Sequence, residues 1–334
     1  MAQSVVYVSC GEGREIDVFC LDVDSGAIRL QQRLPTPGMP IPLRVRMDAG
    51  RLYAGMRDEN AVQAFFIDRQ SGELAALGGV PAPGGPTYVM CDRQMHMLFS
   101  ASYGENNLSV FPLDADGVPT APAQMLSDLP RAHAAMPDYG NRWLLVPTLG
   151  ADAIRIFRLG SEPKLQPNDP PIMLARPGCG PRHPVFSPDN RFVYCLNELD
   201  GHVDAFAFDA EMGALLFRQT ICILPEGFSG APWAAELRIS PDGCFLYATD
   251  RRSSTIAVVA IDKASGRMSM VASYATETQP RGMDLDSTGR WLVVAGQVSN
   301  HLMLYAIDPF TGRLTEQLRI ATAKEPICVE IAAL

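Results

Sequence analysis

Short apolar runs with period two alternate along the chain with clusters of turn-forming residues. One phrase recurs: an apolar run, an Asp, a few polar residues, a Gly and a new apolar run, as in LDVDSGAIRL from Leu21 and IDKASGRMSM from Ile261. Apolar runs around an Asp- and Gly-rich turn are typical of β-hairpins. Clear copies have their Asp at positions 22, 68, 114, 209, 262 and 308, and a degraded copy, FRLGSEPKL, begins at Phe157. The chain therefore predicts seven repeats.

A second phrase lies between copies of the first and predicts another hairpin in each repeat. Here a turn cluster precedes a period-two apolar run, as in DAGRLYAG at Asp48, SPDNRFVYCL at Ser187 and DSTGRWLVVAG at Asp286. Two hairpins per repeat amount to four strands, named A to D in chain order. Seven four-stranded repeats of roughly 45 to 50 residues predict an all-β fold, a seven-bladed β-propeller.

The two ends of the chain predict how this ring closes. VVYVSC near the N-terminus matches a strand B, and PICVEIAAL at the C-terminus matches a strand A. Joining both in one blade closes the ring and removes two free sheet edges, which are otherwise prone to aggregation. We therefore expect residues 1–334 to form a single domain without a linker. The proline-rich segment 165–178 is interpreted as a long loop between blades.

Composition and charge narrow the possible partners. The net charge of −9 argues against nucleic acid or an anionic membrane, because both require a basic surface. The N-terminal MAQSVVYVSCGEG has neither the basic nor the long apolar region of a signal peptide, and no apolar run reaches transmembrane length. Eight scattered cysteines without a CxxC pair are typical of a reducing compartment. These features predict a cytoplasmic protein, a monomer or weak homodimer, that acts on a small molecule.

Motifs for metals, nucleotides and nucleophilic serine are absent from the sequence. There is no HxxEH motif, EF-hand loop or Cys/His spacing of a zinc site. The glycines of GCGPRH match neither GxGxxG nor the P-loop, and GFSG does not match GxSxG. We expect no metal and no cofactor.

Polar residues recur where one end of the central channel is predicted. In a propeller, strand A lines the channel, and the start of A lies on the same face as the end of B. Arg182 and His183 begin one A strand, and Glu198 follows the B strand paired with it. Unpaired buried polar groups cost about 1–3 kcal/mol each, so a ring of them suggests a binding site. Corresponding positions hold Arg57, Tyr103, Arg131, His133, Trp233, Glu236, Asp250, Arg251, Gln279, Arg281 and Gln297.

Each of these residues also has a structural interpretation. Polar side chains in propeller channels often only pack between blades, and Arg182 or Arg281 could serve as an ion-pair partner across such an interface. Residue type and position alone leave both interpretations open.

Three longer segments resemble a known family. GPRHPVFSPD and NEL, from Gly180, LPEGFSGAPWAAELRISPDG, from Leu224, and TETQPRG, from Thr276, are similar to the bacterial propeller-type 6-phosphogluconolactonases. This family also includes the fungal carboxy-muconate lactonising enzyme. The resemblance covers nearly the whole chain and implies a seven-bladed propeller. It further implies a site, since the family's proposed site residues match His133, Arg182, Glu198 and Arg281.

Two positions depart from the family pattern. Pro232 stands where these enzymes often carry an Arg, and Val298 stands where they often carry a Lys. The resemblance implies hydrolysis of 6-phospho-D-glucono-1,5-lactone to 6-phosphogluconate. Fewer cations near the channel leave a non-phosphorylated aldonolactone as an alternative substrate.

The matched residues suggest how a δ-lactone ring would be opened. Glu198 or His133 would be the general base, a role that typically contributes 10²- to 10⁴-fold in rate. Arg182 and Arg281 would stabilise the oxyanion or bind a phosphate, because guanidinium groups bind oxyanions in a bidentate manner. Candidate substrate contacts are His183, Arg251, Tyr103, Gln297, Arg57 and Glu236.

Two other functions compete with this hypothesis. A muconate-type cycloisomerase would use the same arginines to hold two carboxylates and would form a lactone instead of opening one. A non-catalytic binding propeller would carry surface signatures such as the GH…WD pattern in each blade, and the sequence lacks them.

Overall fold

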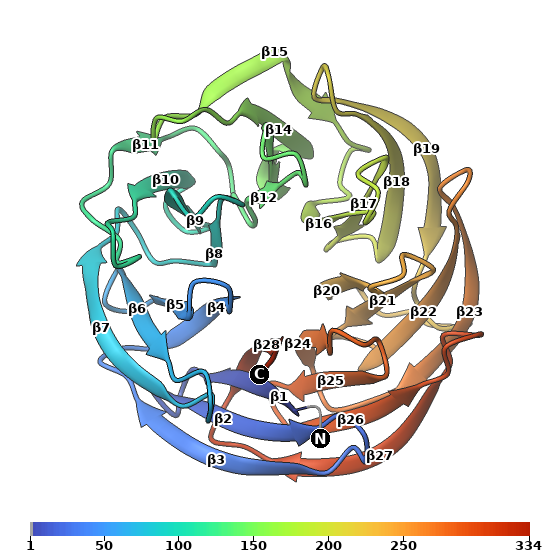
Figure 1. Cartoon of the computed structure of the whole chain (residues 1–334). Helices are drawn as coiled ribbons and strands as arrows, with labels where there is room; N and C mark the ends of the chain where they lie inside the picture. Colours follow the sequence, from blue (N-terminus) through green and yellow to red (C-terminus); the bar gives the residue numbers. More distant parts are fainter. Residues whose placement is uncertain (1–2) are drawn as a thin grey trace.

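The computed structural model describes residues 3–334 and shows a ring of blades around an open centre (Figure 1). Within these residues the strands form seven four-stranded antiparallel sheets. The prediction of an all-β, seven-bladed propeller is therefore confirmed. A short 3-10 helix, η1 (Leu149–Ala151), follows the second strand of blade 4. No helix in the described part of the chain is long and apolar enough to cross a membrane.

Each blade runs outward from strand A at the channel to strand D at the rim. Blade 1 contains β28 (Pro326–Ala333), β1 (Gln3–Cys10), β2 (Glu15–Asp22) and β3 (Ile28–Pro35). Blade 2 contains β4 (Pro40–Arg46), β5 (Arg51–Met56), β6 (Ala61–Ile67) and β7 (Leu74–Pro81). Blade 3 contains β8 (Tyr88–Cys91), β9 (Met97–Ser102), β10 (Asn107–Pro112) and β11 (Gln124–Leu126).

The remaining blades follow in the same order around the ring. Blade 4 contains β12 (Met136–Pro137), β13 (Trp143–Thr148), β14 (Ala153–Arg158) and β15 (Gln166–Leu174). Blade 5 contains β16 (Pro181–Phe186), β17 (Phe192–Asn197), β18 (His202–Asp209) and β19 (Ala214–Cys222). Blade 6 contains β20 (Ala234–Ile239), β21 (Phe245–Asp250), β22 (Thr255–Asp262) and β23 (Arg267–Ala275). Blade 7 contains β24 (Pro280–Leu285), β25 (Trp291–Gly296), β26 (His301–Ile307) and β27 (Leu314–Ala321).

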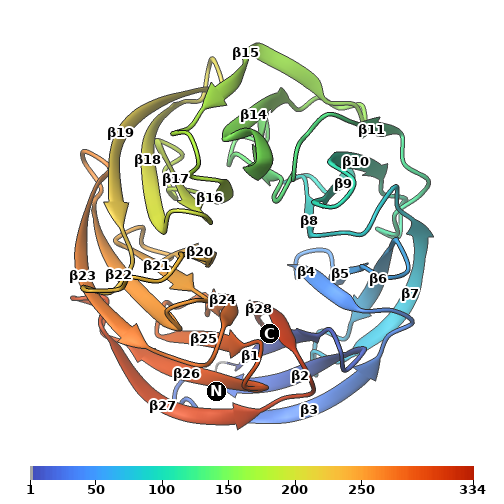
Figure 2. The same cartoon turned by 180° about the vertical axis from the view of Figure 1, so that it is seen from behind.

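The ring closes in blade 1, where the first and last strands of the chain pair. β28 is antiparallel to β1, with Tyr7 opposite Glu330 and Val8 opposite Val329. The chain end marked C therefore lies at the inner edge of the blade that the N-terminal strands build (Figure 2). This is the closure that the terminal sequence patterns predict.

The proline-rich segment is a strand, which corrects its interpretation as a loop. Residues Gln166–Leu174 form β15, the outermost strand of blade 4, and pair only with β14. Proline is tolerated at a sheet edge because one side of the strand has no partner that needs its N–H groups. The register shifts between Arg155 and Phe157, so the pairing adapts to the prolines locally.

At six of the seven interfaces, an aromatic side chain of a B strand joins one blade to the next. Tyr194 of blade 5 donates its hydroxyl hydrogen bond to the carbonyl of Gly266, in the turn between strands C and D of blade 6, at 3.3 Å. Trp143 of blade 4 donates its indole hydrogen bond to Ala210 in the equivalent turn of blade 5, at 2.9 Å. Equivalent bonds to C–D turns start from Tyr7, Tyr53, Tyr247 and Trp291.

The glycine of the recurring Asp…Gly phrase makes room for these aromatic clamps. Gly213 has φ +65°, and a Cβ there would lie 2.4 Å from the Trp143 ring. Such a conformation and contact suit glycine alone. The degraded repeat, FRLGSEPKL, faces blade 3, and no such clamp joins blades 3 and 4 in the described residues; there the apolar cluster of Phe99, Phe157 and Leu165 fills the interface. The recurring glycine position of the repeated phrase therefore corresponds to a contact between neighbouring blades, and the phrase is degraded where that contact is missing.

Candidate active site

The site forms at the channel mouth where A strands begin and B strands end. The A strands of blades 5 and 7 both have a register shift at this end, which falls at Arg182 in β16 and at Arg281 in β24. β-Bulges of this kind redirect a side chain and are common next to active sites. Two of the predicted site arginines are thus bulge residues.

The carboxylate of Glu198 lies among three of the predicted residues. Its Oε2 accepts a hydrogen bond from Arg182 Nε at 2.7 Å, lies 3.1 Å from Arg251 Nη2, and lies 4.0 Å from His133 Nε2. Burial alone would raise the pKa of Glu198, but Arg182 and Arg251 outweigh it and lower the pKa. Glu198 is therefore ionised at neutral pH.

His133 faces this carboxylate as a neutral imidazole. Burial, followed by the charges of Arg182 and His183, lowers the pKa of His133 well below its usual value. Its Nδ1 is buried and has no hydrogen-bond partner within residues 3–334. The ring packs edge-on against His183 at 5.1 Å and against Tyr103 at 5.9 Å between centroids. These contacts hold its plane beside Glu198.

His183 connects the mouth to deeper residues. Its Nδ1 lies 2.8 Å from Glu236 Oε1, so the neutral ring donates there, and Nε2 accepts from Arg182 Nη1 at 3.1 Å. Burial and Arg182 lower the pKa of His183 to about 4, which keeps the ring neutral at pH 7. Arg182 Nη1 also donates to the carbonyl of Ala235. His183 and the Ala235 carbonyl thereby fix the position of the Arg182 guanidinium that binds Glu198.

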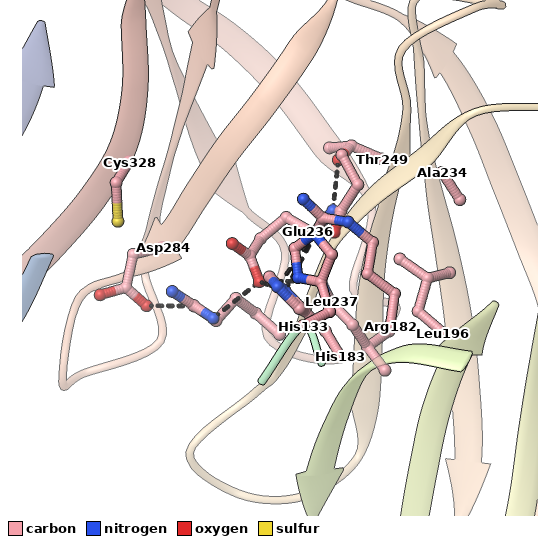
Figure 3. Close-up of polar contacts among 12 residues, drawn as sticks. His133, Arg182, His183, Leu196, Ala234, Glu236, Leu237, Thr249, Asp284 and Cys328 are labelled. Atoms are coloured by element: carbon pink, nitrogen blue, oxygen red, sulfur yellow. Dashed lines mark hydrogen bonds and ion pairs between the residues drawn. The ribbon is translucent and has the colours of Figure 1, made fainter. Parts of the chain in front are cut away.

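Glu236 has several protein partners of its own (Figure 3). Besides His183, its Oε1 accepts from the backbone N–H of Leu237 at 3.1 Å and from Arg238 Nη1 at 2.8 Å. Arg238 continues the chain of contacts to Asp284, 3.0 Å from its Nε. Burial would raise the pKa of Glu236, but Arg238 and His183 lower it to about 2. This carboxylate holds other site residues in place.

The channel narrows below the mouth. A cavity of about 40 Å³ there is lined by residues that include His133, Arg182, His183, Glu236 and Arg281. Arg44, Arg238 and Glu330 border this cavity and also a wider one of about 530 Å³ at the opposite mouth. This layer of side chains separates the two mouths.

Arg281 and Arg57 lie on the mouth with few protein partners. Among the described residues Arg281 makes no hydrogen bond or ion pair, and Arg57 donates only to Thr87 Oγ1, at 3.3 Å. Burial, then Arg182 and Arg57, lower the pKa of Arg281 to about 10; burial also lowers the pKa of Arg57. Both side chains therefore present donors without a protein acceptor to the mouth.

Glu325 is a site residue that the sequence reasoning missed. It directly precedes β28, where its Oε1 accepts a hydrogen bond from Gln297 Nε2 at 2.8 Å. Both Glu325 Oε2 and Gln297 Oε1 are buried and have no partner in the described structure. The sequence contains a signal for this residue, because Glu325 directly precedes the A strand PICVEIAAL and so occupies the same kind of position as Arg182.

Two aromatic residues flank the mouth with cations over their rings. The Arg251 guanidinium lies 3.9 Å from the Trp233 ring centroid, and the Arg131 guanidinium lies 5.6 Å from the Tyr103 ring centroid.

Among the predicted site residues, the structure brings His133, Arg182, Glu198, Arg251 and His183 into one group of contacting side chains. Among residues 3–334 there is no group of three or more His, Cys, Asp or Glu arranged to hold a metal ion.

Known proteins match this chain over nearly its full length. The family described as "Lactonase, 7-bladed beta-propeller" matches residues 5–331. The chain belongs to this lactonase family. Curated relatives include the 6-phosphogluconolactonase of Serratia proteamaculans (strain 568), 38% identical over 331 residues, and that of Pectobacterium atrosepticum, 39% identical over 332 residues; each alignment covers 99% of both chains.

Solved structures of lactonase-family proteins share the architecture. The Pseudomonas aeruginosa periplasmic gluconolactonase PpgL superposes with a TM-score of 0.91 at 28% identity, covering 98% of this chain and 99% of that one. A Bacteroides uniformis structure described as a putative 6-phosphogluconolactonase superposes at 0.89 with 26% identity, covering 99% of each chain. The cycloisomerase and scaffold alternatives find no support among these relatives.

Proposed function

We propose that this protein hydrolyses 6-phospho-D-glucono-1,5-lactone to 6-phosphogluconate. The observation that carries this proposal is an ionised carboxylate, Glu198, held between two arginines and facing a neutral imidazole in a cation-rich channel mouth. The choice of substrate rests on the curated relatives named 6-phosphogluconolactonase, which match this chain over its full length. A sugar-acid lactone requires a base, an oxyanion donor and an anion-binding surface, and this mouth offers all three.

Glu198 is the general base in this proposal. Its Oε2 is held by Arg182 and Arg251, whereas Oε1 has no hydrogen-bond partner among residues 3–334 and is available to a water molecule. Glu198 accepts a proton from that water as the water oxygen bonds to the lactone carbonyl carbon. The low pKa makes Glu198 a weak base, but an anionic substrate that neutralises the arginines would raise it.

Arg182 and Arg251 stabilise the oxyanion that forms on the carbonyl oxygen. Arg182 Nη2 and Arg251 Nη1 have no protein acceptor in the described structure, so each has a donor to offer. Fixed donors aimed at a developing negative charge typically contribute more than any other single effect. Collapse of the tetrahedral intermediate breaks the bond from the carbonyl carbon to the ring oxygen. That oxygen then takes the proton from Glu198, which leaves the acid product.

His133 and His183 orient the reactants. His133 lies 4.0 Å from Glu198 and is neutral, so it can exchange a hydrogen bond with the attacking water. Glu236 fixes the tautomer of His183 and acts through it, so we class Glu236 as a positioning residue and not as the substrate contact that the sequence suggested. Tyr103 makes an edge contact with the His133 ring.

We further propose that the protein acts in the cytoplasm as a monomer or weak homodimer. All eight cysteines are free thiols, as a reducing compartment favours. A phosphorylated sugar acid is also a molecule that cells retain inside. Subcellular fractionation and light scattering of the purified protein test both points, and a periplasmic protein or a stable oligomer would contradict them.

A direct assay tests the proposed activity. The purified protein is mixed with freshly prepared 6-phosphoglucono-δ-lactone at pH 6.5, where spontaneous opening is slow, and acid release is followed in a pH-stat. We expect first-order loss of lactone far above the uncatalysed rate. A rate equal to that of buffer, or turnover of muconates detected by ultraviolet absorbance, would contradict the proposal.

A further inference from the structure

The polar residues of the mouth divide into two arcs, each built by three consecutive blades of the ring. The first arc, with His133, Arg182, Glu198 and Arg251, comes from blades 4, 5 and 6. The second arc consists of Arg281 and Gln297 from blade 7, Glu325 from blade 1 and Arg57 from blade 2. Figure 1 shows that the two arcs meet where β20 of blade 6 lies beside β24 of blade 7, whereas β12 and β28 face each other across the channel. The proposed chemistry uses only the first arc.

The second arc holds cationic donors without acceptors. Arg281 makes no hydrogen bond or ion pair with any residue of 3–334, although it lines the narrow channel cavity. Arg57 has a single protein acceptor, the Thr87 hydroxyl. By contrast Arg182 and Arg251 each contact Glu198 and backbone carbonyls. Arginines left without partners in a partly dry site favour the binding of an anion.

The same arc also holds acceptors without donors. Gln297 and Glu325 bond to each other, and that bond leaves Gln297 Oε1 and Glu325 Oε2 buried with no donor in the described structure. A carboxylate and an amide oxygen that lack donors match hydroxyl groups, which donate one hydrogen bond each. One arc thus complements a molecule that carries both an anionic group and alcohols.

We propose that the second arc binds the phosphorylated end of the substrate, with Arg57 and Arg281 on the phosphate and Glu325, supported by Gln297, on a neighbouring hydroxyl. This inference rests on the proposed function. It adds an explanation of substrate selectivity, because the residues of the second arc make the enzyme prefer a phosphorylated lactone over a plain one. Arg57 and Arg281 would replace the cations that the family often carries where this chain has Pro232 and Val298.

A comparison of two substrates tests the assignment. The kcat/KM for 6-phosphoglucono-δ-lactone and for glucono-δ-lactone is measured in wild type, Arg57→Gln and Arg281→Gln. We expect the ratio of phosphorylated to plain lactone to fall about ten-fold or more in each variant, because each loses a charged hydrogen bond to phosphate. Arg57→Lys and Arg281→Lys keep the charge, lose the bidentate fork and should retain part of the ratio.

Arg14→Gln is the matched control. Arg14 lies in the B–C loop of blade 1 on the same face, is half exposed, and pairs with Asp58. Its ratio should equal that of wild type. Glu325→Gln should raise KM for both lactones while it preserves the ratio, since it weakens a hydroxyl contact and leaves the phosphate contacts intact.

Calorimetric titration with 6-phosphogluconate, gluconate and inorganic phosphate measures binding without turnover. We expect wild type to bind 6-phosphogluconate more tightly than gluconate, and both Gln variants to lose that difference while circular dichroism shows a native fold. Equal losses on both substrates, or a wild type that prefers the plain lactone, would overturn the inference but leave lactone hydrolysis standing. A wild type that binds phosphorylated ligands and opens neither lactone would instead overturn the proposed function.

Discussion

Glu198 is a carboxylate placed where cations outnumber carboxylates. Arg182 and Arg251 hold one of its oxygens, and Arg281 adds to the charges that lower its pKa. Such an arrangement keeps a base ionised and simultaneously presents donors to a developing oxyanion. The bulge that falls at Arg182 explains how a strand that lines a channel places its guanidinium beside the end of the neighbouring strand.

Replacing Glu198 by Gln should lower kcat for the phosphorylated lactone by about 10²- to 10⁴-fold, because an amide cannot accept a proton from water. It should also lower the melting temperature, since two buried arginines lose their counter-charge. Steady-state kinetics and thermal unfolding check both effects. Glu226→Gln, on an exposed loop, is the control with unchanged values. Turnover of Glu198→Gln within three-fold of wild type would rule out Glu198 as the base.

The rate of lactone hydrolysis should not fall near pH 6.5, where an ordinary histidine would titrate. The pKa of Glu198 and that of His133 are both lowered, so the ionised carboxylate and neutral imidazole persist as the pH falls from 7.5 to about 5.5. Activity is present above these pKa values and is lost only as the pH falls through them. Initial rates of lactone loss by NMR between pH 4 and 7.5 measure this. A ten-fold decline between pH 6.5 and 5.5 with glucono-δ-lactone, which lacks the phosphate group that itself titrates near pH 6, would indicate a protein group with an ordinary histidine pKa.

The sequence predicted the first group of site residues because their positions follow from strand polarity. Once Arg182 starts strand A and Glu198 ends strand B, antiparallel pairing must place them side by side. Arg238 was not predicted, although it lies two residues after Glu236 in β20 and therefore on the same face of the strand. Arg238 forms ion pairs with Asp284 and Glu330, which come from blades 7 and 1. These pairs form only because the ring brings three blades together, so they cannot be predicted from the sequence of a single repeat.

At the scale of elements, the C–D turns have two roles. They close the hairpins through hydrogen bonds within the turn, and they pack against the neighbouring blade. In the six blades whose C–D turn contains the recurring Asp, this Asp accepts backbone hydrogen bonds within the turn, as Asp262 does from Ala264 and Ser265. Gly266 of the same turn lies against Phe192 of the preceding blade. Sequence patterns identify such turns well. They failed for β15, where prolines suggested a loop, because an edge strand requires hydrogen bonds on one side only.

Gly213→Ala should destabilise the protein by more than the matched substitution Gly227→Ala. Both glycines have positive φ, +65° and +76°, so both variants bear a similar backbone strain of about 1–2 kcal/mol. A Cβ at Gly213 would lie 2.4 Å from the Trp143 ring, whereas nothing lies within 4 Å of one at Gly227. Overpacking adds about 1–3 kcal/mol. Urea unfolding of both variants measures the difference, and equal values would refute the clamp as a tight contact.

At the scale of the whole molecule, closure converts a chain of blades into one unit. Each blade contacts its two neighbours, as repeats do in an open array, but β28 joins the last segment of the chain to the first. Open arrays unfold gradually because their repeats are coupled only to neighbours. We propose that residues 1–334 form one cooperative domain. A closed ring has no terminal blade, so the unfolding of any blade breaks two interfaces, whereas a terminal repeat of an open array breaks only one.

Removal of residues 326–334 should therefore affect the entire ring. Without β28, strand β1 loses its inner partner and Glu330 no longer accepts from the backbone N–H of Val45 in blade 2. We expect calorimetry to show one transition for the full chain, with van't Hoff and calorimetric enthalpies in agreement, and a broad transition at least 10 °C lower for the truncated chain. A synthetic peptide of residues 326–334 should restore the sharp transition by strand addition, and a scrambled peptide should not. Two resolved transitions in the full chain, or a truncated chain as stable as the full one, would show that the blades do not depend on closure.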